Sequence, residues 1–149
     1  MCGFAWWLTH RVRVMLYVYS VDPWRCVRVM LDTQFHDCGK PFCLIIDSDG
    51  KRHFPNHAEV SAFYFNQAFD NQVASDLIRR DMDIHLLKSD GVDSFSREPH
   101  ALTLLLTGLA EVHSNSQIFG GLDSISFKIK HKSITQRGKQ IINKIKNKN

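Results

Sequence analysis

The chain has 149 residues, of which 44% are hydrophobic and 23% charged, with ten Phe, three Trp and three Tyr. This length and composition are typical of one globular domain and exclude wholesale disorder. The four cysteines, Cys2, Cys26, Cys38 and Cys43, lack the spacing of paired zinc knuckles or of a dense disulfide scaffold. We therefore expect reduced cysteines, no metal, no cofactor and a cytoplasmic location.

Charge is divided unevenly along the chain. Residues 128–149 carry eight Lys or Arg and no Asp or Glu, whereas residues 1–127 carry eleven basic and fifteen acidic side chains. An acidic body with a net charge of −4 is thus followed by an end of +8. Such asymmetry indicates the kind of partner rather than the kind of chemistry.

The first residues are interpreted as separate from the core. Met15 could equally start the chain, so residues 1–14 are assigned to an extension or leader, residues 15–132 to the core, and residues 133–149 to a basic C-terminal helix and tail. The apolar start precedes its charged residues, which is the reverse of an export signal. The next apolar run, Val14 to Tyr19, is too short to span a membrane. We therefore expect no membrane partner.

Alternation of apolar and polar residues predicts strands in the first third of the chain. The predicted strands cover residues 11–21, 25–31, 42–46 and 51–54. Asp22-Pro23 separates the first pair, and Asp49-Gly50 is a strong hairpin turn between the second pair. A β-meander is expected here.

Two helices are predicted next. Asn56, with Glu59 three residues later, has the spacing of an N-cap and capping box and opens a helix that runs to about Phe69. Asp70 is expected to cap a second helix that ends at Arg79-Arg80. Residues 81–88 alternate and predict a strand. Leucines three and four residues apart predict a helix over 99–112, although threonines and a glycine keep a strand open there.

Residues 122–132 show a clean alternation and predict a strand with one apolar face and one lysine face. Ser133 and Gln136 then mark the start of a short closing helix. The order of elements predicts an α+β fold, with a single domain and a largely antiparallel sheet that has helices packed on one face.

The basic end is the leading candidate for function. Its cations could follow a phosphate backbone, so we expect a nucleic acid or another anionic partner to be bound by Lys128, Lys130, Lys132, Arg137, Lys139 and Lys144. The alternative is a charged edge strand and solvated tail that only oppose aggregation. No base-reading motif accompanies the charge.

The predicted helix Asn56 to Phe69 has apolar side chains on opposite faces. Val60, Phe63 and Tyr64 share one face, and Ala58, Ala62, Phe65 and Phe69 share the other. Two apolar faces require two partners, which are internal layers, a second copy of the chain or a ligand. We expect a homodimer.

A second candidate function is small-molecule binding or catalysis in a pocket between this helix and the sheet. The residues proposed for this pocket, or for the interface, are His53, His57, Tyr64, Phe65, Phe69 and His85. Imidazoles can transfer protons, and aromatic rings can contact a bound ligand. No complete catalytic or nucleotide motif is present, however, so no catalytic residue is assigned.

Overall fold

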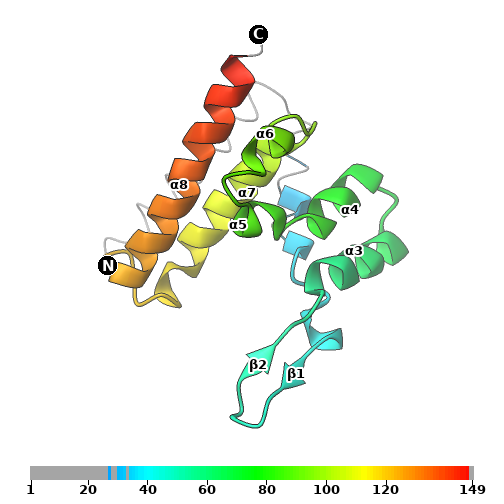
Figure 1. Ribbon diagram of the computed structural model, residues 1–149. Helices are drawn as coiled ribbons and strands as arrows, with labels where there is room; N and C mark the ends of the chain where they lie inside the picture. The colour runs from blue at the N-terminus through cyan, green and yellow to red at the C-terminus, as the bar shows by residue number, and fades with distance from the viewer. Residues whose placement is uncertain (1–26, 28–29, 33, 148–149) are drawn as a thin grey trace.

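The computed structural model describes residue 27, residues 30–32 and residues 34–147. The expected extension 1–14 and the predicted strand 11–21 lie outside this part. The described part is mostly helical and holds one small antiparallel sheet (Figure 1). Helices therefore pack mainly on other helices, and the large sheet expected from the sequence does not appear among the described residues.

The described elements follow one another in a simple order. They are η1 (Lys40–Phe42), β1 (Ile45–Ile46), β2 (Arg52–His53), α3 (His57–Ala68), α4 (Gln72–Arg79), α5 (Asp83–Leu86), α6 (Val92–Phe95), α7 (Ala101–Ser114), η2 (Asn115–Gln117) and α8 (Ile125–Lys146).

The predicted hairpin around Asp49-Gly50 is confirmed, with strands of only two residues each. β1 and β2 pair antiparallel, with Ile45 opposite His53. The Asp47 carboxylate accepts hydrogen bonds from the backbone N–H groups of Asp49 at 3.0 Å and Lys51 at 2.8 Å. Gly50 takes the positive φ, 75°, that the turn requires. The hairpin projects away from the helices at the α3 end (Figure 1).

Three predicted strands are wrong. Residues 27, 30 and 31, which fall within the predicted strand 25–31, are helical. Residues 83–86 form α5, and residues 125–132 belong to α8. The apolar residues of 122–132 alternate as in a strand, but they also belong to a longer helical repeat. Phe127, Ile134 and Ile141 recur every seven residues, which is about two helical turns, and all three are buried.

The closing helix expected at Ser133 is the second half of α8. Its N-cap is Ser124, whose Oγ accepts a hydrogen bond from the Phe127 amide at 3.1 Å. Gly138 allows α8 to approach α7. A Cβ there would lie 3.1 Å from Cδ1 of Leu105.

Three predicted helices are confirmed, with changes at their ends. α3 begins after Asn56, but this residue has φ of 54° and its side chain makes no capping hydrogen bond. The cap of α4 is Asn71 rather than Asp70, because Asn71 Oδ1 accepts a hydrogen bond from the Ala74 amide at 3.0 Å. For the predicted segment 99–112 the helix is correct and the strand is not, because residues 101–114 form α7.

The buried apolar side chains form two clusters. The larger joins α4, α5, α6, α7 and α8, and α7 and α8 run side by side within it (Figure 1). The smaller joins α3 to α4 through Ala62, Phe65, Ala74 and Ile78, with Leu31 and Phe35 packed against it. No helix of the described part is both long and apolar enough to cross a membrane.

A matched pair of variants tests the orientation of α3. Phe65 is 1% exposed and Phe63 is 58% exposed. We expect Phe65→Ala to lower the free energy of unfolding by about 3–5 kcal/mol, because it opens a cavity in the smaller cluster. Phe63→Ala should cost less than about 1 kcal/mol. Equal losses in urea denaturation would contradict this orientation.

Candidate functional site

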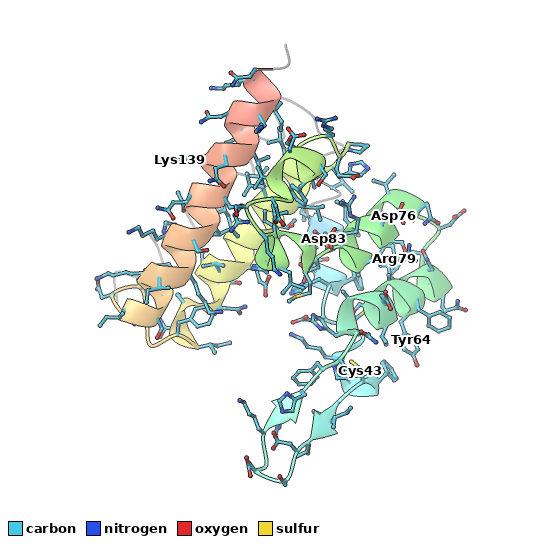
Figure 2. All side chains as sticks on the ribbon, in the orientation of Figure 1. Cys43, Tyr64, Asp76, Arg79, Asp83 and Lys139 are labelled. Atoms are coloured by element: carbon cyan, nitrogen blue, oxygen red, sulfur yellow. The ribbon has the colours of Figure 1, made fainter. Side chains whose placement is uncertain are left out.

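Four lysines of α8 form an outer lysine row. At 100° per residue, they fall within about 40° of one another on the helix surface. They are Lys128, Lys132, Lys139 and Lys146, and all are exposed. Figure 2 shows Lys139 on the side of α8 turned away from α7. Among the described residues, Lys128 alone in this row has a carboxylate neighbour, Asp123 at 3.6 Å.

The other three predicted cations form an inner cationic row beside the buried face of α8. Each already has an intramolecular partner. Lys130 Nζ lies 4.9 Å from the centre of the Phe119 ring, and Arg137 donates a hydrogen bond to the Leu87 carbonyl. Lys144 Nζ lies 3.3 Å from a carboxylate oxygen of Asp93. The six cations proposed from the sequence are thus divided between two faces.

The outer face of α3 carries an aromatic patch. Phe42 and Tyr64 stack with ring centres 4.0 Å apart, and Phe63 meets Tyr64 edge-on at 5.4 Å. Phe42 is 63% exposed and Phe63 is 58% exposed. The aromatic patch (Phe42, Phe63 and Tyr64) adjoins the exposed β1 isoleucines in sequence. Its apolar area has no cover in the described chain.

The structure separates the other residues proposed for the pocket or interface. His53 is exposed on the hairpin, where Nε2 lies 2.8 Å from Asp47 Oδ2. Phe65 is 1% exposed and packs in the smaller core cluster. Phe69 is 44% exposed and its ring lies 5.1 Å from that of Phe35. His57 and His85 instead lie near opposite ends of an interior group of charges.

That interior group contains three carboxyls from distant parts of the chain. Asp32 and Asp81 are 0% and 4% exposed, and Glu111 projects from α7. Neither Asp32 oxygen accepts a hydrogen bond from the described residues. The nearby Thr107 hydroxyl donates to the Leu104 carbonyl at 3.0 Å instead. We call Asp32, Asp81 and Glu111 the interior carboxylate cluster.

Histidines and one lysine adjoin this cluster. His85 Nε2 lies 2.7 Å from Glu111 Oε2 on one side. On the other side, Asp37 lies 3.4 Å from His36, 2.6 Å from Lys40 and 3.8 Å from His57. Charged groups therefore continue from the base of α3 to the gap between α5 and α7.

Burial sets the protonation of the cluster. Burial, reinforced by the negative charge of Asp81, raises the pKa of Asp32 to about 7. Burial and then the charge of Glu111 raise the pKa of Asp81. The Glu111 carboxylate, 2.7 Å away, raises the pKa of His85. Burial alone would raise the pKa of Glu111, but His85 brings it below its ordinary value. Each partner of the Glu111–His85 contact thus favours the charged form of the other, while Asp32 exchanges a proton near neutral pH.

A pocket of about 410 Å³ lies between α5, α7 and α8. The Glu111–His85 pair forms part of its wall, and Lys130 and Arg137 line the α8 side. The remaining lining residues are Met82, Ile84, Leu87, Val112, Asn115, Phe119, Ile129, Ser133 and Ile134. His85 thus lines a pocket, but this pocket is not the one expected between the Asn56–Phe69 helix and the sheet.

The described side chains do not assemble a metal site, since no three His, Cys, Asp or Glu of this part are arranged to hold an ion. Cys38 and Cys43 are free thiols. Their Sγ atoms approach backbone carbonyls, those of Ser61 and Gly39, at 3.5 Å each.

Sequence reasoning missed the interior carboxylate cluster altogether. Its members stand 30 to 79 positions apart, so no local motif joins them. One signal was available. Asp32 follows an apolar run, and Glu111 interrupts the leucine-rich segment, so each carboxyl falls on or beside an apolar helix face.

No protein-family model matches this chain, and no curated protein or solved structure is measurably similar to it.

The raised pKa of Asp32 predicts a dependence of stability on pH. The folded state retains a proton that the unfolded state releases above its pKa of about 4, so Asp32 lowers stability progressively as pH rises from about 4 to 7. Asp32→Asn removes this loss. Its stability relative to the unmodified protein should therefore increase between pH 5 and pH 8, by on the order of 2 kcal/mol.

Urea denaturation at both pH values measures the difference. The control is Asp76→Asn, which removes the same formal charge from the surface of α4. An Asp32→Asn difference that does not change with pH would show that Asp32 is already ionised in the folded protein.

Proposed function

We propose that this is a cytoplasmic, homodimeric binding protein that contacts the phosphate backbone of a nucleic acid through the outer lysine row. The observation that carries the proposal is the alignment of Lys128, Lys132, Lys139 and Lys146 on one exposed face of α8. The helix itself contains no Asp or Glu. A cytoplasmic location agrees with the free thiols of Cys38 and Cys43.

The dimensions of the row suit an extended polyanion. At a rise of 1.5 Å per residue, Lys128 and Lys146 are separated by about 27 Å along α8. Several phosphates of a nucleic acid fall within that length, because duplex DNA carries about one charge per 1.7 Å of its axis. Lysine ammonium groups bind phosphates as point charges. A compact anion would use one or two of these lysines and leave the others unused.

An anionic membrane is less compatible with this helix. A basic amphipathic helix binds a bilayer by inserting its apolar face below the headgroups. The face of α8 that carries Phe127, Ile134 and Ile141 is already buried in the larger core cluster, which leaves only Ile125, Ile129 and Ile142 exposed. Binding should depend little on base sequence, because phosphate contacts carry no sequence information.

Two triple variants with equal charge change test the proposal. Lys132→Gln, Lys139→Gln and Lys146→Gln together remove three charges from the outer lysine row. Lys130→Gln, Arg137→Gln and Lys144→Gln remove three from the inner cationic row. We expect fluorescence anisotropy with a labelled oligonucleotide to show at least about tenfold weaker binding for the outer variant, and a several-fold smaller loss for the inner one.

Salt dependence supplies an independent measurement. Four phosphate contacts should weaken binding to duplex DNA by roughly two orders of magnitude between 50 and 200 mM salt, and the outer variant should reduce that slope. No binding at 50 mM salt, or equal losses for the two variants with unchanged melting temperatures, would exclude the outer lysine row as the contact surface.

The homodimer is supported by the aromatic patch. The inner face of α3 is covered by the protein's own core, whereas Phe42, Phe63 and Tyr64 are stacked together and exposed. Exposed aromatic area of this kind is uncommon on monomers. A second copy of the chain presents the same patch, so a two-fold interface can bury both at once.

Sedimentation equilibrium tests the dimer. We expect a mass of two chains at tens of micromolar and a monomer for Phe63→Asp, because a buried unpaired carboxylate is costly at an interface. Ile118→Asp is the matched control, since Ile118 is 79% exposed and belongs to η2's C-cap rather than to α3. A monomeric unmodified protein would rule out the homodimer.

A further inference from the structure

The pocket between α5, α7 and α8 combines a buried apolar floor with an accessible rim. Ile84, Val112 and Ile134 are each no more than 6% exposed, whereas Ile129 is 63% exposed. A volume of about 410 Å³ lies in the range that proteins use for small ligands, roughly 300–1,000 Å³. The floor offers apolar contact to a ligand that enters past Ile129.

The charges of this pocket do not balance. Glu111 lies 2.7 Å from His85 and makes no ion pair with either pocket cation among the described residues. Lys130 and Arg137 have no carboxylate partner among the described residues, since one lies over the Phe119 ring and the other donates to the Leu87 carbonyl. A guanidinium has five N–H donors, so the bond to Leu87 leaves donors for a ligand. Two cations therefore remain uncompensated beside an apolar floor.

We propose that this pocket binds a small amphiphilic anion, an aliphatic chain with a terminal carboxylate. The carboxylate contacts Arg137 and Lys130, and the chain lies along Ile84 and Ile134. A flat aromatic ligand such as a nucleobase fits less well, because the ammonium of Lys130 covers the Phe119 ring. This site faces α7, on the opposite side of α8 from the outer lysine row, and its occupancy does not depend on nucleic-acid binding.

Decanoate is a suitable probe, with 1-decanol and decyltrimethylammonium as ligands of the same chain length and different charge. Titration of the ¹⁵N-labelled full chain at pH 7, below the micellar concentrations, should show saturable amide shifts for decanoate at Ile84, Val112 and Ser133. We expect decanol to bind at least about tenfold more weakly, since it lacks the charge that Arg137 and Lys130 recognise. The cationic probe should not bind at this site.

Variants of the two cations separate charge recognition from apolar contact. Lys130→Gln and Arg137→Gln should each weaken decanoate binding by about tenfold and leave decanol binding unchanged. Lys139→Gln removes one charge from the opposite face of the same helix and should have no effect. If Arg137→Gln loses its fold, Lys130→Gln still decides, because Lys130 is exposed and its replacement removes no core contact.

Three results would overturn the proposal. They are equal affinities for decanoate and decanol, shifts confined to the aromatic patch, and no saturable shift up to several millimolar decanoate. The outer triple variant distinguishes the two proposals, because it should lose oligonucleotide binding and keep decanoate binding.

Discussion

The packing of α7 against α8 is the constraint on which the other features depend. Helix α7 is buried around most of its circumference, and its leucines meet the seven-residue repeat of Phe127, Ile134 and Ile141. This contact fixes the rotation of α8 about its own axis. That rotation decides which cations face solvent and which face the pocket. The packing of the apolar face of α8 thus determines where its charged side chains lie.

The same central helix brings charge into the interior. Thr107 and Glu111 project from α7 toward Asp32 and Asp81, which come from the chain on either side of α3 and α4. Buried carboxyls without hydrogen bonds lower stability, and one of these remains protonated up to about neutral pH. Such a loss of stability is usual at functional sites, where buried polar groups are placed against the general pattern of apolar packing. The Glu111–His85 pair connects this cluster to the pocket.

The sequence predicted best where its signals were local. The Asp49-Gly50 hairpin rests on turn chemistry and the helix over 99–112 on periodicity within one element. The start of α3 after Asn56 was also located, although Asn56 makes no capping hydrogen bond. Secondary structure was predicted wrongly where a strand period of two and a helical period both fit the same segment. Residues 122–132 satisfy an alternation of two, and only the burial of Ile134 and Ile141 beyond the segment's end favours the helix. The division of the C-terminal lysines into two rows depends on helical geometry, which the predicted strand over 122–132 does not have. The pocket and the interior carboxylate cluster require tertiary contacts, which no local pattern contains.

The register of α8 has a consequence for how this chain can change in length. One inserted residue near its middle would rotate the C-terminal half by about 100°. Ile141 would leave the core, and Lys139 and Lys146 would move out of line with Lys128 and Lys132. Insertions of seven residues, close to two whole turns, would preserve both alignments. Viable relatives of this protein should therefore differ within α8 by substitution or by whole pairs of turns, while the exposed β1–β2 turn is free to lengthen one residue at a time.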